Sequence, residues 1–325
     1  MITGVGSYLP TNKFSNESLS NFVDTSDEWI SKRSGIKNRH FVADDEKTSD
    51  LAFFAANKAL ENAQISKNDI DLIVLATTTP DNTFPSTATL VQKKLEINAV
   101  SFDIQAVCAG FVFALSVAKS MMIEGMYKNC LVIGADSMSK LLDWKDRSTS
   151  VLFGDGAGAI ILQKFENIEG KYDDWGILSN IIHSDGQFYD LLKTTGGVSM
   201  SQKVGFIEME GKEVFKHAID KLSTSLDEAL KASNKKIDEL DWLVPHQANQ
   251  RIILAVADKM KIDVSKVIST VKDHGNTSAA SIPLALENAI ALNKISNGNL
   301  IGLHAIGGGL SWGASIIRIG KPKIL

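Results

Sequence analysis

The feature that most constrains the fold is a repeated order of helix and strands. Each copy begins with an apolar helix, and two β-branched strands follow it. The first strand starts 23 positions after Cys108 in one copy and 24 positions after Asn276 in the other. The segments are 108–125, 131–134 and 158–162, then 277–292, 300–303 and 313–317. Although α/β proteins repeat strand–helix units in any case, we favour duplication and predict halves at 1–168 and 169–325.

Short strands alternating with helices predict an α/β fold with mostly parallel sheets. A buried strand is expected over Leu72–Ala76 and another over Ser101–Ile104, before the first apolar helix. The polar stretch 163–174 would join the halves. Helices from both halves would then converge at the centre, which is a natural place for a shared site.

Composition excludes several classes of protein. The 325 residues are 44% hydrophobic and 22% charged, which is typical of a soluble globular chain. A net charge of −4 gives no basic field for nucleic acid. We expect neither membrane insertion nor a signal peptide. Two cysteines favour a cytoplasmic location, and six scattered histidines indicate no metal site.

Cys108 is the candidate nucleophile. It follows the strand at 102–104 and opens the apolar helix, so the helix dipole is expected to lower its pKa. The apolar helix also predicts that the thiol is buried. Cys130 begins an interior strand, and we interpret it as a core residue.

His246 and Asn276 occupy positions typical of functional residues. His246 follows the strand ending at Pro245, and sheets of α/β proteins place ligand sites at strand C-terminal ends. Asn276 precedes the second-half helix, the place that Cys108 takes in the first half. The alternatives are a structural histidine and an asparagine that caps a helix.

Two glycine-rich runs have different interpretations. Three consecutive glycines at 307–309 could expose backbone N–H groups to a developing oxyanion, or could simply form a tight turn. The run at 154–158 precedes a strand and lacks a Lys-Ser/Thr ending, so it is not a nucleotide loop.

Cysteine, histidine and asparagine together support more than one class of protein. The chain order matches papain-like hydrolases, although the local papain signature is absent. Thioester condensation is the second class, and non-catalytic thioester binding is the third. The residues alone leave these open.

Six motifs in order along essentially the whole chain resemble β-ketoacyl-acyl carrier protein synthase III. They include Thr25-Ser-Asp-Glu-Trp-Ile30, Phe102–Gly110, Phe153–Gly158, Val244–Asn249, His274–Ser278 and Gly307–Gly309. The resemblance implies a thiolase-like fold, with duplicated halves in a five-layered α-β-α-β-α arrangement, and a homodimer. It also implies decarboxylative condensation of an acyl-CoA primer, such as acetyl-CoA, with malonyl-acyl carrier protein, with no cofactor beyond coenzyme A as substrate.

The same resemblance assigns roles to individual residues. Cys108 would take the acyl group, and His246 and Asn276 would hold the malonyl thioester carbonyl. The amides of Cys108 and Gly308 would form the oxyanion hole. A degradative thiolase needs a second cysteine near the glycine-rich loop, and this sequence has none there. A related condensing enzyme of secondary metabolism remains an alternative.

Further residues resemble the family's substrate contacts. The predicted coenzyme A contacts are Trp29, Arg33, Arg147 and Asn249, and the predicted docking residues for the acidic carrier protein are Lys216, Arg251 and Lys259. Asp258 departs from the family pattern, which often has a basic residue there. Phe84 resembles the residue that reaches the partner subunit's acyl pocket, and its size would favour a short primer.

Overall fold

The first half of the chain builds a five-stranded sheet in a computed structural model that describes residues 1–165 and 173–320. Its strand order is β1-β7-β6-β4-β5. Helices α3 (Thr48–Ala63) and α4 (Thr87–Leu95) cover its outer face. The strands are β1 (Ile2–Tyr8), β4 (Leu72–Ala76), β5 (Val100–Ile104), β6 (Asn129–Ser137) and β7 (Asp155–Gln163).

The second half repeats this plan with a four-stranded sheet in the order β11-β12-β13-β8. Helices α8 (Gly211–Ala232) and α9 (Gln250–Lys259) lie on its outer side, with α8 directly against the strands. Its strands are β8 (Gly176–Ser184), β11 (Trp242–Pro245), β12 (Leu300–Gly307) and β13 (Ser311–Arg318). An isolated parallel bridge from Leu243 to Val267 takes the place that β5 has beside β4.

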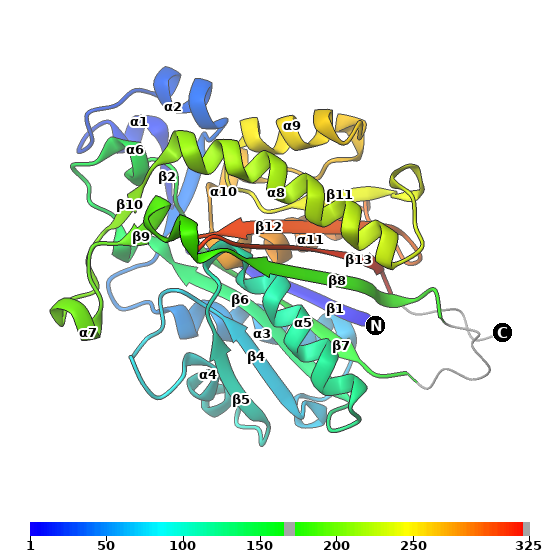
Figure 1. Cartoon of the computed structure of the whole chain (residues 1–325). Coiled ribbons are helices and arrows are strands. Elements are labelled where there is room, and N and C mark those ends of the chain that lie inside the picture. The colour runs from blue at the N-terminus through cyan, green and yellow to red at the C-terminus, as the bar shows by residue number, and fades with distance from the viewer. Residues whose placement is uncertain (166–172, 321–325) are drawn as a thin grey trace.

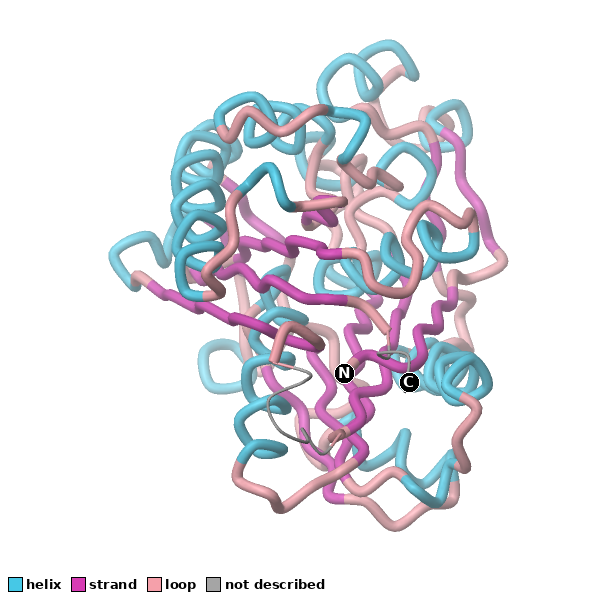
Figure 2. The backbone as a smooth tube through the Cα atoms, turned by 90° about the vertical axis from the view of Figure 1, so that its right-hand side faces the viewer, coloured by secondary structure: helices cyan, strands magenta, loops and turns pink. Residues whose placement is uncertain are grey.

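Two central helices separate the sheets, α5 (Gly110–Ile123) and α11 (Ser281–Ala291). Helix α5 contacts strands of both sheets, and α11 packs mainly on β1 and β7 (Figure 1). Both helices are largely buried and apolar because each faces a sheet rather than water. The result is the expected α-β-α-β-α layering, in which helices flank the strands above and below (Figure 2).

Duplication is therefore confirmed in the order of elements, because α5-β6-β7 in one half matches α11-β12-β13 in the other. The predicted boundary at 168/169 lies outside the described residues. The expectation of mostly parallel sheets is wrong, because both sheets are mixed. Strands β4, β5 and β6 are parallel, whereas β6–β7 and β12–β13 are antiparallel. For β12 and β13 the cause is a tight glycine turn, which can join only antiparallel neighbours.

The remaining elements cover the edge of the molecule where the two central helices begin (Figure 1). They are β2 (Asn12–Ser15), α1 (Asn16–Leu19), α2 (Asp27–Ser34), β3 (Asn38–Phe41), α6 (Arg147–Ser150), β9 (Leu192–Thr194), α7 (Val198–Ser201), β10 (Ile207–Met209) and α10 (Val271–His274). The described residues contain no helix that is both long and apolar enough to cross a bilayer.

Candidate active site

Cys108 lies in a short 3-10 turn, η2 (Val107–Ala109), between the end of β5 and the first residue of α5. The α-helix therefore begins two residues later than the sequence suggested. Val107 has a positive φ of 49°, an unusual conformation for a β-branched residue. Gly307 closes on this turn so tightly that a Cβ on it would lie 2.7 Å from the Cys108 nitrogen. The thiol is thus held by backbone from both halves of the chain.

The resting thiol is protonated. Burial raises the pKa of Cys108 to about 12, and the nearby Asp136 carboxylate raises it further. The sequence-based expectation of a lowered pKa is wrong for the chain without substrate, because desolvation of a thiolate outweighs the helix dipole here. Any reaction in which this sulfur is the nucleophile would therefore require loss of the thiol proton.

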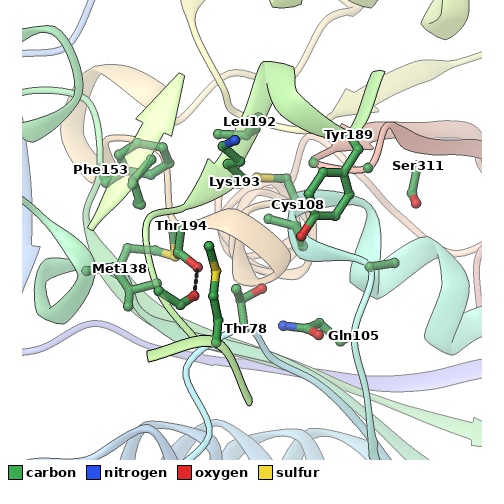
Figure 3. Close-up of a pocket in the computed structure, with 18 residues that line it drawn as sticks. Thr78, Gln105, Cys108, Met138, Phe153, Tyr189, Leu192, Lys193, Thr194 and Ser311 are labelled. Atoms are coloured by element: carbon green, nitrogen blue, oxygen red, sulfur yellow. Dashed lines mark hydrogen bonds between the residues drawn. The ribbon is translucent and has the colours of Figure 1, made fainter. Parts of the chain in front are cut away.

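Cys108 opens onto a cavity of about 360 Å³ (Figure 3). Gly308 lines the same cavity, as the oxyanion prediction requires, whereas His246 and Asn276 do not. Side chains around the thiol are largely apolar, with a few polar groups. They include Met138, Leu141, Phe153, Leu192, Met200 and Ile207, together with Thr78, Gln105, Lys193 and Thr194.

Asn276 reaches this region from the second half. Its backbone bonds to the first half on both sides, from its N–H to Leu152 O (2.9 Å) and from Gly154 N–H to its carbonyl (3.0 Å). Its Oδ1 accepts the Ser278 N–H at 2.9 Å. The side-chain oxygen is occupied, so the amide NH₂ is the group left to donate to a ligand.

His246 follows β11 and is 4% exposed. Its Nδ1 lies 2.6 Å from Ser281 Oγ, in the first turn of α11. Burial lowers the pKa of His246 to about 3, and the neighbouring His304 contributes in the same direction. The imidazole is therefore neutral near pH 7.

The segment that leads into α11 links these three residues. Ser278 precedes α11 and lies near enough to Cys108 and to Asp136 to lower both pKa values, although its Oγ makes no hydrogen bond of normal geometry. Asn276 bonds to Ser278, and His246 bonds to Ser281 three residues further on. His246 and Asn276 are thus both hydrogen-bonded to the segment Ser278–Ser281, and Ser278 of that segment also lies close to the buried thiol.

The predicted coenzyme A contacts gather on the surface around α2. Arg33 and Arg147 lie over the Trp29 ring, with guanidinium carbons 4.2 and 5.1 Å from its centroid. Asn249 Nδ2 donates to Arg33 O at 3.2 Å. A second cavity there is lined by Ser26, Glu28, Trp29, Lys32, Arg33 and Arg251. Arg251, a predicted docking residue, thus lines the same cavity as Trp29 and Arg33, two of the predicted coenzyme A contacts.

The other predicted docking residues lie on neighbouring helices. Lys216 is on α8 beside Glu213, and Lys259 is on α9 and pairs with Asp220. Phe84 is 84% exposed and does not line the cavity of its own chain. Cys130 is fully buried in β6, as expected of a core residue.

Sequence reasoning missed several buried polar residues around the site. Asp136 accepts hydrogen bonds from Thr78 N–H (2.6 Å) and Ala279 N–H (3.2 Å), and so links the halves. Arg39 is completely buried and donates to Val151 O at 2.9 Å. Asp136 falls at a strand end, which is a weak signal. Nothing in the sequence around Arg39 marks it as buried.

The fold is a duplicated α-β-α-β-α arrangement, and a buried thiol, a neutral histidine and an asparagine amide lie between its halves. These features define a thiolase-like condensing enzyme. A family model described as 3-oxoacyl-[acyl-carrier-protein (ACP)] synthase III matches residues 102–186. A second model, described as the C-terminal part of the same synthase, matches residues 230–319. Beta-ketoacyl-[acyl-carrier-protein] synthase III proteins from Ehrlichia canis and Dinoroseobacter shibae are 54% and 52% identical. Each match covers 98% of this chain, and 99% and 98% of the relative.

Solved structures agree with this assignment. A synthase III from Aquifex aeolicus superposes with a TM-score of 0.91 at 44% identity, covering 98% of this chain and 99% of that one. The priming β-ketosynthase of the R1128 polyketide pathway has a TM-score of 0.90 at 32% identity, covering 98% and 96%. The chain belongs to the β-ketoacyl-acyl carrier protein synthase III family. It is a condensing acyltransferase that starts fatty-acid synthesis by joining an acyl primer to malonyl-acyl carrier protein.

Proposed function

We propose that Cys108 carries the acyl group and that His246 and Asn276 catalyse decarboxylation of the malonyl thioester. The observation that supports this proposal is the contact of all three residues with the segment Ser278–Ser281, which leads into α11. In the first step the Cys108 sulfur bonds to the acyl carbon and the bond to the coenzyme A sulfur breaks. The thiol proton ends on coenzyme A, and the amides of Cys108 and Gly308 stabilise the tetrahedral oxyanion.

In the second step malonyl-acyl carrier protein loses carbon dioxide and leaves an enolate. Two neutral donors, the imidazole N–H of His246 and the amide NH₂ of Asn276, stabilise its oxygen. The carbanion attacks the acyl-Cys108 carbonyl, the bond from the acyl carbon to the Cys108 sulfur breaks, and the departing thiolate takes up a proton from solvent to restore the thiol. Decarboxylation itself supplies the carbanion, so the step needs neither a strong base nor a metal, and coenzyme A enters only as part of the substrate.

The primer is proposed to be short, with acetyl-CoA first among candidates. The support is Phe84, which is large and 84% exposed, and which we propose enters the acyl pocket of a partner subunit in a homodimer. Rates with acetyl, butyryl and branched acyl-CoA test this idea, and a preference for long chains contradicts it. Phe84→Ala should then widen the range of primers.

Trp29, Arg33, Arg147 and Asn249 are proposed to bind coenzyme A. The flat Trp29 ring and two guanidinium groups suit an adenine ring and phosphates. A cytoplasmic location is proposed as well, since coenzyme A thioesters and carrier protein meet there.

Lys216, Arg251 and Lys259 are proposed to dock the acidic carrier protein. Arg251 lies next to the predicted coenzyme A contacts, whereas Lys259 is partly neutralised by Asp220. Arg251→Glu should raise KM for malonyl-acyl carrier protein about 10-fold or more through charge reversal. Acylation by acyl-CoA should change far less, and equal loss of both half-reactions would contradict a docking role.

Intact-protein mass after incubation with acetyl-CoA tests the nucleophile. Wild type should gain about 42 Da, the mass of an added acetyl group, and Cys108→Ser should not. Malonyl-acyl carrier protein should then discharge the adduct as a 3-oxoacyl product. Rapid loss of the adduct to water without product would instead support a thioester hydrolase. An adduct formed only with unusual primers would point to secondary metabolism, as in the polyketide ketosynthase of similar fold.

A further inference from the structure

Ser281 occupies a place where it can control the proton on His246. It is the first residue of α11 and is 1% exposed. Its Oγ lies 2.6 Å from His246 Nδ1 and 3.3 Å from the Gln247 nitrogen. A single hydroxyl therefore contacts both the imidazole and the backbone that follows it.

The direction of these hydrogen bonds follows from donor counting. The Gln247 N–H can only donate, so Ser281 Oγ accepts there. Within the described part of the chain, the hydroxyl hydrogen has no recorded acceptor other than His246 Nδ1. Nδ1 then carries the lone pair, and the single N–H of a neutral imidazole must be on Nε2.

We propose that Ser281 is a positioning residue that fixes His246 as the Nε2–H tautomer, and so aims a neutral donor at the malonyl thioester oxygen. The inference rests on the proposed role of His246. With the other tautomer, Nε2 would present a lone pair to the forming enolate oxygen and repel it. Ser281 therefore acts only in the decarboxylation step and not in acyl transfer to Cys108.

The backbone around His246 is rigid enough for this single bond to decide the tautomer. His246 N–H donates to His304 O at 2.8 Å, which anchors the residue to β12. The neighbouring Gln247 side chain donates to Pro245 O (2.7 Å) and accepts from Thr270 N–H (2.8 Å). The backbone of His246 is thus anchored by bonds that do not involve Ser281, so removing the hydroxyl should chiefly affect the imidazole and the position of its proton.

The test combines half-reaction kinetics with nitrogen NMR on the full chain. Ser281→Ala should leave the rate of Cys108 acylation by acyl-CoA within about 2-fold of wild type. The kcat for decarboxylative condensation should fall about 10- to 100-fold, a loss that approaches the effect of removing an oxyanion donor. Ser281→Thr keeps a hydroxyl and should recover most of the rate. Ser225→Ala is the matched control, since Ser225 is also buried but its hydroxyl donates to Leu222 O within its own helix rather than to a histidine.

Tautomers are observed directly in ¹⁵N-histidine-labelled protein, with the His246 signals assigned by their loss in His246→Ala. Wild type should show Nε2–H, and Ser281→Ala should show a mixture or Nδ1–H. An Nδ1–H tautomer in wild type overturns the proposal, as does an unchanged tautomer in Ser281→Ala. Unimpaired decarboxylation by His246→Ala would defeat the proposed role of His246, and the wild-type spectrum still decides the tautomer.

Discussion

The turns that lead into the two central helices have the same shape but different chemistry. The turn η2 precedes α5, and its counterpart η8 (Ser278–Ala280) precedes α11. Each begins with a residue of positive φ, Val107 at 49° and Ser278 at 51°. The second residue of each turn is Cys108 in one half and Ala279 in the other. The counterpart of the nucleophile is therefore Ala279, not Asn276 as the sequence spacing suggested.

The backbone N–H of that second residue has different neighbours in the two halves. Asp136 Oδ2 accepts the Ala279 N–H at 3.2 Å. Beside Cys108 the neighbour is Gly307, which has no side chain. One turn is thus capped by a carboxylate, which stabilises it, whereas the other has a glycine beside the amide that we propose stabilises the oxyanion. The two turns occupy equivalent places in the duplicated plan, and only the one without the carboxylate cap carries the proposed nucleophile.

Gly307→Ala should remove this difference between the two turns, because it places a side chain beside the Cys108 amide. We expect the largest effect from this substitution. The new Cβ would lie 2.7 Å from the Cys108 nitrogen and 2.8 Å from Ala106 O, so the turn must move or the amide is blocked. Acylation of Cys108 should slow by at least about 100-fold, as expected for loss of an oxyanion donor. Single-turnover acylation, followed by mass, measures it. Gly186→Ala is the control, because its Cβ would have no neighbour within 4 Å, and a normal rate in Gly307→Ala would contradict the assignment of the open amide.

Asp136→Asn should weaken the capped turn and lower the free energy of unfolding by about 2–3 kcal/mol, the range for buried hydrogen bonds to a charged group. Its two oxygens accept only from donors, including Thr78 N–H and Ala279 N–H, so an NH₂ at either position faces another donor. Urea denaturation measures the loss. Asp71→Asn is a useful control, since Asp71 also accepts two backbone N–H groups but at a more exposed site. Equal losses in the two variants would show that Asp136 has no special structural role.

The two halves also differ in how they should respond to acid. The histidines with the lowest pKa values, His246, His274 and His304, all lie in the second half, where burial lowers them to about 3, 4 and 4. Because each folded pKa lies below the unfolded value of 6.5, the associated stability is present above pH 6.5 and is lost as the pH falls toward 4. Buried Asp155 has a raised pKa of about 6 and acts in the opposite direction.

His304→Leu should therefore make the second half less sensitive to acid. Neither ring nitrogen of His304 has a hydrogen-bond partner among the residues that the structure describes, so the substitution breaks no such bond there. A shift from 6.5 to about 4 corresponds to about 2 kcal/mol of stability lost at pH 5, and the variant should be spared that loss. Urea denaturation at pH 8 and pH 5 gives the comparison. Parallel pH profiles for wild type and variant would show that His304 does not titrate in this range.

Sequence patterns predicted the duplicated α/β plan, because apolar periodicity and glycine turns are local features. Strand directions were less accessible, since the antiparallel pairing of β6 with β7 is made by contacts distant in the chain. The motifs also located Cys108, His246 and Asn276. They could not give the raised pKa of Cys108, which depends on burial by both halves, nor the contacts of Ser281 and Asp136, which reach across 35 residues to His246 and 143 residues to Ala279.

The smallest effect expected concerns the shared shape of the two turns. A left-handed conformation costs a residue with a side chain about 1–2 kcal/mol, whereas glycine adopts it freely. Ser278→Gly relieves that cost and removes a hydroxyl that lies close to Cys108 and Asp136 but makes no hydrogen bond of normal geometry. The gain offsets the greater freedom of glycine in the unfolded chain, so the free energy of unfolding should stay within about 1 kcal/mol of wild type.

Ser225→Gly in the middle of α8 is the matched comparison, because it removes a buried serine from an ordinary helix. Glycine costs about 0.5 kcal/mol relative to serine in a helix interior, and loss of the hydrogen bond from Ser225 Oγ to Leu222 O adds to that cost. Urea denaturation should therefore show Ser278→Gly to be more stable than Ser225→Gly by about 1–2 kcal/mol. If the two variants lose the same stability, the turn before α11 is not strained. The two turns would then share a backbone shape but not its cost in stability. Any strain in the turn at Cys108 would need a cause that is specific to the first half.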